Sequence, residues 1–253
     1  RQLVDKIINE MPEKFNDYYE PFVGGGAVFF NLYGLRKIRK AYLNDSNPDL
    51  INAYKVIQKR TPELIEELKN PKYKNEKESH NKIRASNPAD SVEKATRFIY
   101  LNKTSFNGLY RVNSKGQFNV PFGRYKNPSI FDETNLWLIN KALKGVVITC
   151  LDFEDVIKTA KKNDVVYFDP PYYPLNKTSS FTQYTTNSFS FEDQARLSNS
   201  FKNLNNKGVK VLLSNSNTQE IKSLYSNFSQ IEVFANRAIN CKADKRGKIL
   251  ELL

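Results

Sequence analysis

Residues 18–26, with the sequence YYEPFVGGG, decide the fold of this chain. The stretch Tyr18–Val23 predicts a short strand that runs into three glycines, and the apolar residues 27–30 begin a helix. A second strand is expected at Ala41–Leu43, and an acid follows it closely. Strand, glycine turn, helix and strand form one βαβ unit, which is the building block of parallel sheets covered by helices.

The middle of the chain has a different pattern. From about Asp49 to Phe106 the periodicity is helical, broken by three prolines. Residues 110–121 then show the alternation and the central turn of a β-hairpin. We therefore expect an inserted domain of residues 48–143 that consists of helices and a hairpin.

The last third of the chain alternates strands with helices again. Its strands are expected at Val146–Thr149, Val165–Phe168, Val209–Leu213, Ile231–Ala235 and Ile249–Leu253. This alternation favours a mostly parallel sheet with helices on both faces. The expected architecture is a Rossmann-like α/β domain formed by residues 1–47 and 144–253, interrupted by the insertion.

The glycine turn and the strand after it indicate a nucleoside site. Glycines let a backbone turn tightly and approach a ligand without a Cβ in the way. Asp45 lies 19 residues after Gly26, where nucleotide-binding βαβ units place an acid that binds ribose hydroxyls. Phe29 stands where a dinucleotide fingerprint needs a small residue, and no Lys-Ser/Thr pair of a P-loop follows the glycines. An adenosyl ligand without a pyrophosphate fits best, and a simple glycine-rich turn is the alternative.

A second candidate site follows the apolar strand Val165–Phe168. The next residues are Asp169-Pro170-Pro171-Tyr172, at the strand end where open α/β sheets bind ligands. The two prolines remove two N–H donors and leave rigid carbonyl acceptors beside a carboxylate and an aromatic ring. The Asp169 carboxylate and the Pro170 carbonyl could accept both N–H groups of an aromatic amine, and Tyr172 could stack on its ring. The amine nitrogen could then attack a sulfonium methyl; a purely structural turn is the alternative.

The charge of the chain indicates a polyanionic partner. Its 39 Lys and Arg residues exceed its 27 Asp and Glu residues by 12, and its pI is about 9.5. No acid occurs from Lys94 to Phe131, whereas seven basic residues do, interleaved with aromatic ones. Basic side chains contact phosphates, aromatic ones stack or intercalate, and a hairpin can enter a major groove. We expect this segment to bind double-stranded DNA, with a solvated basic face as the alternative.

Other features exclude several classes of protein. Cys150 and Cys241 cannot form a disulfide scaffold and lack metal-ligand spacing, so no metal site is expected. The single histidine, His80, lies in a polar and charged stretch and is expected on a solvated helix surface. No apolar run approaches the ~18 residues of a membrane helix, and no signal peptide is visible, which favours the cytoplasm. We expect a monomer that does not bind membranes.

The two motifs together resemble those of S-adenosylmethionine-dependent DNA adenine methyltransferases. They are EPFVGGG at residues 20–26 and DPPY at residues 169–172. Their order, with a long insertion between them, is similar to that of the Dam-type enzymes (alpha group, D12 class), whose insertion is the target-recognition domain. Residues 106–113 (FNGLYRVN) and 117–126 (QFNVPFGRYK) resemble the segments by which these enzymes read GATC. Methylases of GATC restriction–modification systems, such as the pneumococcal Dpn methylase, are the expected near relatives.

The resemblance implies roles for individual residues. Those implied for cofactor binding are Glu20, Pro21, Phe22, Gly24, Gly26, Asp45, Asp152, Phe153 and Asp169. Those implied for catalysis are Asp169, Pro170, Pro171 and Tyr172. Those implied for DNA binding are Phe106, Asn107, Leu109, Arg111, Asn119, Pro121, Arg124 and Lys126. In the last set Arg111 would contact guanine, and Phe106 would fill the duplex beside an extruded base.

The expected function is transfer of a methyl group from S-adenosylmethionine to the exocyclic amine of adenine in GATC duplexes. A stacked adenine cannot reach a pocket, so the base must flip out, and residues 174–190 are expected to form a mobile loop that closes on it. Residues 236–248 are expected to be a second mobile stretch near DNA. The family's Trp/Gly-Gly/Lys segment would lie immediately before Arg1, and we expect the cofactor to bind poorly without it.

Other functions and the biological setting stay open at this point. Methylation of another amine, on cytosine or on a protein, is one alternative. A DNA-binding regulator with a vestigial methyltransferase fold is another. The enzyme could serve restriction–modification, repair or regulation.

Overall fold

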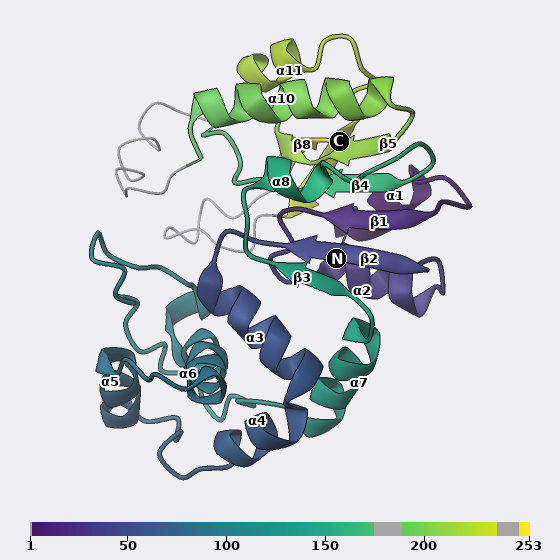
Figure 1. The fold of residues 1–253 in the computed structure, drawn as a ribbon. Helices are drawn as coiled ribbons and strands as arrows, with labels where there is room; N and C mark the ends of the chain where they lie inside the picture. The colour runs from purple at the N-terminus through teal and green to yellow at the C-terminus, as the bar shows by residue number, and fades with distance from the viewer. Residues whose placement is uncertain (1, 175–188, 237–247) are drawn as a thin grey trace. The chain divides into compact units, whose positions relative to one another are not determined.

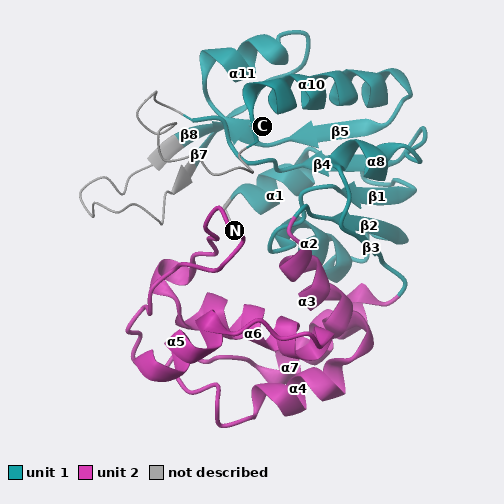
Figure 2. Cartoon of the chain, turned by 60° about the vertical axis from the view of Figure 1, so that its left-hand side comes forward, with its two compact units in different colours: residues 1–46, 145–253 teal, residues 47–144 magenta. Residues whose placement is uncertain are grey.

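The computed structural model describes residues 2–174, 189–236 and 248–253 of the chain. It divides into two compact units, coloured separately in Figure 2. Unit 1 consists of residues 1–46 and 145–253, and unit 2 of residues 47–144. In the described part of the chain, no helix is long and apolar enough to cross a membrane.

Unit 1 is built on a parallel sheet. Its strands are β1 (Asp17–Glu20), β2 (Lys40–Asn44), β3 (Val147–Thr149), β4 (Val165–Phe168) and β5 (Lys210–Leu213). They lie in the order β3-β2-β1-β4-β5, and every neighbouring pair is parallel. The α/β class and the parallel sheet predicted from the sequence are therefore confirmed.

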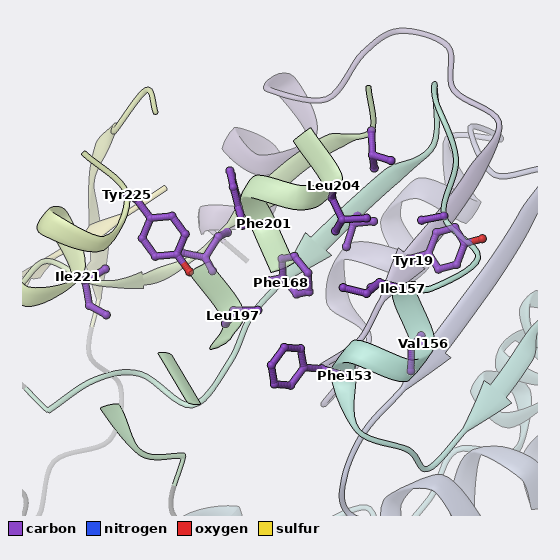
Figure 3. Packing of buried hydrophobic residues seen from close by; sticks show 14 of the residues in the cluster. Tyr19, Phe153, Val156, Ile157, Phe168, Leu197, Phe201, Leu204, Ile221 and Tyr225 are labelled. Carbon is purple, nitrogen blue, oxygen red and sulfur yellow. The ribbon is translucent and has the colours of Figure 1, made fainter. Parts of the chain in front are cut away.

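Helices cover both faces of this sheet (Figure 1). Behind it in that view lie α1 (Gln2–Asn9) and α2 (Ala27–Gly34), and in front of it α8 (Phe153–Ile157) and α10 (Phe191–Asn206), with α11 (Gln219–Leu224) beyond α10. Alternate strand residues point to opposite faces. Tyr19, Val166 and Phe168 accordingly pack with residues of α8, α10 and α11 in one buried cluster (Figure 3).

The end of unit 1 differs from the expected parallel alternation. The strands β6 (Asn215–Ser216), β7 (Glu232–Asn236) and β8 (Lys248–Leu252) form a separate antiparallel sheet in the order β6-β8-β7. A parallel pair needs a crossover connection of a dozen or more residues, usually a helix. Only residues 237–247 lie between β7 and β8, and antiparallel pairing suits that short connection.

Unit 2 is mainly helical, as the periodicity predicts. Its helices are α3 (Pro48–Lys59), α4 (Thr61–Leu68), α5 (Lys77–Ala85), α6 (Ser91–Thr104), the 3₁₀ turn η1 (Phe106–Gly108) and α7 (Glu133–Leu143). Side-chain caps fix several starts: Asn47 accepts N–H bonds from Asp49 and Leu50, and Asp90 caps α6 in the same way. Pro62 does not end a helix but lies in the first turn of α4, where a missing N–H costs nothing.

The hairpin expected at residues 110–121 is only partly formed. The turn is present: the Asn113 side chain accepts the backbone N–H groups of Lys115 and Gln117, and Val112 bridges Phe118. Regular strands are absent from this described segment, although the N–H groups of Asn113 and Asn119 donate to the carbonyls of Gln117 and Arg111, and Pro121 has no N–H with which to continue this ladder. Its carbonyl instead accepts the N–H of Phe106, at 2.9 Å.

The expectation of a solvated His80 is wrong. The ring is fully buried, with Nδ1 3.0 Å from the Thr104 hydroxyl and Nε2 3.3 Å from the Val120 carbonyl. Burial lowers the pKa of His80, so the ring is neutral. Nε2 faces the Val120 carbonyl, which only accepts, and the Thr104 hydroxyl beside Nδ1 donates to the Tyr100 carbonyl at 2.8 Å. The polar residues around His80 in the sequence hide this role, since its partners lie far along the chain.

Candidate active site and DNA-reading segment

Unit 1 holds a large pocket at the carboxyl ends of its parallel strands. The cavity has a volume of about 1030 Å³ and lies where the strand order reverses between β1 and β4. All the residues expected to bind cofactor or to act in catalysis line it: Glu20, Pro21, Phe22, Gly24, Gly26, Asp45, Asp152, Phe153, Asp169, Pro170, Pro171 and Tyr172. Parallel strands thus bring four separate stretches of sequence to one cavity.

The glycine loop and Asp45 form one wall of the pocket. The Gly24 N–H donates to Asp45 Oδ2 at 3.1 Å, and Gly26, at φ 67°, is the N-cap of α2. A Cβ on Gly25 would meet no protein atom within 4 Å, and its φ lies outside the left-handed region. Neither packing nor backbone strain requires glycine at position 25. Close approach of a ligand to the backbone would require it.

Glu20 is a buried acid at the end of β1. Its side chain is 2% exposed, and its Oε2 accepts the Tyr18 hydroxyl at 2.9 Å. Burial raises the pKa of Glu20 to about 8, and the nearby charge of Asp169 adds to the shift. The carboxyl group is therefore largely protonated at neutral pH, and a cationic ligand group beside it would favour its ionised form.

Asp169 and Glu251 are two further acids in this pocket. Asp169 is open to the cavity, yet the protein packed behind it desolvates the carboxylate and raises its pKa to about 6, with Glu251 adding to the shift. The Tyr172 hydroxyl donates to Glu251 Oε2 at 3.1 Å. Nothing in the local sequence marks Glu251, which reaches the pocket through β8 of the antiparallel sheet.

Aromatic rings form the apolar part of the lining. The ring of Phe22 lies 5.5 Å from that of Phe153 and 5.6 Å from that of Phe189, which it meets edge-on. All three rings line the cavity, and together they offer a flat heterocycle an apolar surface. Sequence reasoning expects Phe22 and Phe153 here, and it places Phe189 in a loop expected to close on the flipped base.

Arg196 is a pocket residue that the sequence does not reveal. It pairs with Asp152, Glu154 and Asp193 at 3.0 Å each, and its guanidinium lies 5.0 Å from the Phe153 ring centre. Asp152 also caps α8 through the Glu154 N–H. Asp152 therefore has a structural role at the N-terminus of α8 besides lining the pocket.

In unit 2, the residues expected to contact DNA lie on or beside one segment, residues 105–126, which we call the reading segment. Phe106 and Leu109 are 47% and 37% exposed, although both are large and apolar. Asn107 and Asn119 are half-buried, and the others are exposed: Arg111, Pro121, Arg124 and Lys126. The Arg111 Nε–H donates to Asn119 Oδ1 at 2.8 Å. This bond orients the guanidinium and leaves its two terminal nitrogens as the donors for a partner.

The basic residues in and around the reading segment carry uncompensated charge. Within the described residues, none of the seven basic side chains between Lys94 and Lys126 forms a salt bridge. Six of the seven are exposed; the half-buried Arg97 donates to the carbonyls of Ile83 and Arg84. Such a surface attracts a polyanion.

Comparison with known proteins decides the family. The sequence model of the D12 class N6 adenine-specific DNA methyltransferases matches residues 1–239. The chain belongs to this family. It is 46% identical to the type II methyltransferase M1.LlaDCHI of Lactococcus lactis subsp. cremoris, over 100% of this chain and 90% of the relative. The type II methyltransferase M.MjaIII of Methanocaldococcus jannaschii is also 46% identical, over 100% of this chain and 94% of its own. The DNA adenine methylase of Vibrio cholerae is 37% identical over 99% of this chain and 90% of the relative.

The protein is therefore a DNA adenine methyltransferase, and the earlier alternative of a vestigial regulator is set aside. The pocket of unit 1 offers this methyltransferase acids, rigid carbonyls and aromatic rings in one cavity. The loop expected to close on the flipped base, 174–190, and the stretch expected near DNA, 236–248, lie largely outside the described residues. Of the first, Ser190 is described and caps α10 in a capping box with Asp193.

Proposed function

We propose that this methyltransferase moves a methyl group from S-adenosylmethionine to the exocyclic amine of adenine in double-stranded GATC, after the base has flipped out of the helix. The observation that carries the proposal is the convergence of the glycine loop, Asp45 and Asp169–Tyr172 on one cavity of unit 1. This combination offers separate partners for a nucleoside, for a cationic group and for an aromatic amine.

The residues of the pocket fit the cofactor. Asp45, fixed by its bond to the glycine loop, can accept hydrogen bonds from ribose hydroxyls. Phe22 and Phe153 can hold an adenine ring, and the backbone at Gly25 has room for close approach. The buried carboxyl of Glu20 suits the cofactor's ammonium group, whose charge would favour the ionised acid. When bound, the cofactor supplies an electrophilic sulfonium methyl.

The DPPY residues act on the base amine. The Asp169 carboxylate and the Pro170 carbonyl accept its two N–H groups, while Tyr172 stacks on the ring. Binding both hydrogens would make the nitrogen lone pair available to the methyl carbon, whose bond to sulfur would break as the sulfonium becomes a neutral thioether. The methylated nitrogen then has one proton too many, and Asp169, whose pKa of about 6 lies near neutrality, can accept it.

The reading segment supplies sequence preference. The two terminal nitrogens of Arg111 can bind O6 and N7 of guanine, a pattern that no other base presents in the major groove. Leu109 and Pro121 would touch neighbouring bases, and Asn107, Arg124 and Lys126 would lie near phosphates. Phe106, exposed despite its apolar ring, would occupy the space beside the extruded adenine. GATC as the target rests on the resemblance of this segment to Dam-type enzymes.

Incorporation of radiolabelled methyl tests this function. The full-length protein should transfer methyl from S-adenosylmethionine to a GATC duplex, and hydrolysis of the DNA should yield N6-methyladenine. Asp169→Ala should lower single-turnover transfer on the order of 10³-fold, because a charge-assisted hydrogen bond and the orientation of the amine are lost. Its affinity for DNA should stay within a factor of two. Label on cytosine, label on the protein, or near-normal turnover by Asp169→Ala would contradict the proposal.

A further inference from the structure

Two buried amide side chains lie behind the DPPY turn and outside the residues that line the pocket. Gln194, in α10, and Asn215, in β6, are both fully buried. Gln194 Nε2 donates to the Pro171 carbonyl at 3.0 Å, and Asn215 Nδ2 donates to Gln194 Oε1 at 2.9 Å. Asn215 Oδ1 accepts the backbone N–H of Tyr173 at 3.1 Å. The three bonds form one chain from Tyr173 to Pro171.

The backbone groups at its two ends fix the direction of this chain. The N–H groups of Tyr173 and Ser216 can only donate, so the Asn215 oxygen must face them and its nitrogen must face Gln194. Gln194 must then present its oxygen to Asn215 and its nitrogen to Pro171, whose carbonyl can only accept. Each amide therefore has a single satisfied orientation, and a group without this polarity breaks the chain.

The bonds bracket Tyr172 in the backbone. Pro170 and Pro171 have no N–H groups, so the turn cannot secure itself with donors of its own. One amide contact precedes Tyr172 and the other follows it, while its hydroxyl is bound to Glu251. Free movement of this turn would displace the ring and the Pro170 carbonyl together.

We propose that Gln194 and Asn215 are positioning residues that set the Tyr172 ring and the Pro170 carbonyl for the base amine. The proposal rests on the function proposed for Asp169–Tyr172. It assigns the pair no contact with DNA or cofactor, because neither side chain lines the pocket. Loss of the pair should slow the methyl-transfer step and leave the binding of both substrates nearly unchanged.

The test compares Gln194→Met with Ser198→Ala. Methionine keeps the length of the side chain but can form neither bond. Ser198 lies one turn along the same helix, is equally buried, and bonds to the Leu224 carbonyl at 2.9 Å, away from the DPPY turn. Gln194→Met should lower kcat by 10-fold or more, with KM for S-adenosylmethionine and for the duplex within a factor of two. Ser198→Ala should lower the unfolding temperature while kcat stays within a factor of two.

A second variant keeps the polarity of the side chain but shortens it. Gln194→Asn keeps an amide but is one carbon too short to hold both partners, so its kcat should fall as well. Normal kcat in a folded Gln194→Met, an equal loss in Ser198→Ala, or failure of both Gln194 variants to fold would overturn the proposal. Asp169→Ala, measured in parallel, distinguishes failure of the proposed function from failure of the positioning role. If it stays active, the function of the DPPY turn is wrong; if it is inactive while Gln194→Met is normal, only the positioning role is wrong.

Discussion

The pocket of unit 1 and the reading segment of unit 2 are organised in opposite ways. Around the pocket, strand ends, glycine turns and buried amides fix the backbone. Burial raises the pKa of Glu20, and desolvation by the protein packed behind Asp169 raises its pKa. The reading segment presents exposed cations and three exposed large hydrophobic side chains, Phe106, Leu109 and Tyr125. The difference teaches that the pocket is preorganised, whereas the side chains that we propose for recognition are hydrated in the absence of a partner.

The largest expected effect is the pH dependence of the free energy of unfolding, which tests the burial of the acids in the pocket. Folded Glu20 keeps its proton up to about pH 8, whereas an unfolded chain loses it near the ordinary value of 4.5. Between these values the folded state binds more protons, so its stability should fall as pH rises. Asp169 should add to the fall up to about pH 6. Glu20→Gln should flatten the dependence and raise the free energy of unfolding at pH 8 on the order of 4 kcal/mol.

Urea unfolding between pH 5 and 8 measures this effect. Glu78→Gln is the control in unit 2, because Glu78 is exposed and its hydrogen bond to Lys82 lowers its pKa. That substitution should leave the downward slope of the whole protein unchanged. An identical slope in wild type and Glu20→Gln would show that Glu20 is not held protonated in the folded protein.

Two glycines sharpen the comparison next. A Cβ on Gly123, after the reading segment's turn, would lie 2.9 Å from the backbone C and O of Ser105. Gly123→Ala should therefore destabilise the protein by about 1–3 kcal/mol. Gly25→Ala should leave the stability of the protein unchanged or slightly higher, because the added Cβ meets no protein atom. It should lower the affinity for S-adenosylmethionine by about 10-fold or more, because the Cβ would clash with the ligand. Thermal unfolding and calorimetry distinguish the two; full cofactor affinity in Gly25→Ala would refute the proposed approach.

Asp45 gives an effect of similar size that is confined to the pocket. Asp45→Ala should weaken the binding of S-adenosylmethionine by about 1.5–3 kcal/mol, because it removes charge-assisted hydrogen bonds to ribose. Asp45→Asn keeps an acceptor for the Gly24 N–H and should lose only part of this affinity. Titration calorimetry with the full-length protein gives both values. DNA affinity serves as the internal reference and should not change in either variant.

The sequence predicts the residues of the pocket better than the structure of the reading segment, for physical reasons. Glu20, Asp45 and Asp169 each end a strand with a clear apolar pattern, and parallel strands bring such ends to one edge. Glu251 and Arg196 reach the same cavity through elements whose local sequence gives no sign of it. Their positions depend on the antiparallel sheet and on the packing of α10, which are set by contacts between distant residues.

Some predictions for the middle of the chain are wrong because contacts between distant residues decide its structure. His80 lies in a polar stretch, but its partners Thr104 and Val120 are 24 and 40 residues away, and they bury it. The alternation around residues 110–121 predicts a regular hairpin, yet Pro121 ends the ladder early. Local patterns report the preferences of a segment, whereas tertiary partners decide burial and strand length.

The central claim is that unit 2 selects the sequence while unit 1 performs the transfer, and Arg111 tests it most directly. The measurement is the methylation rate of GATC relative to duplexes altered at the first base, in Arg111→Ala and in Lys126→Ala. Both variants lose one exposed positive charge. Arg111→Ala should cost about 1–3 kcal/mol on GATC and relax the preference at that base. Lys126→Ala should slow the methylation of all duplexes by the same factor. It should also lower the slope of log binding constant against log salt concentration by about one. If Arg111→Ala slowed every duplex by the same factor, Arg111 would only contact phosphate, and the assignment of sequence reading to this segment would be contradicted.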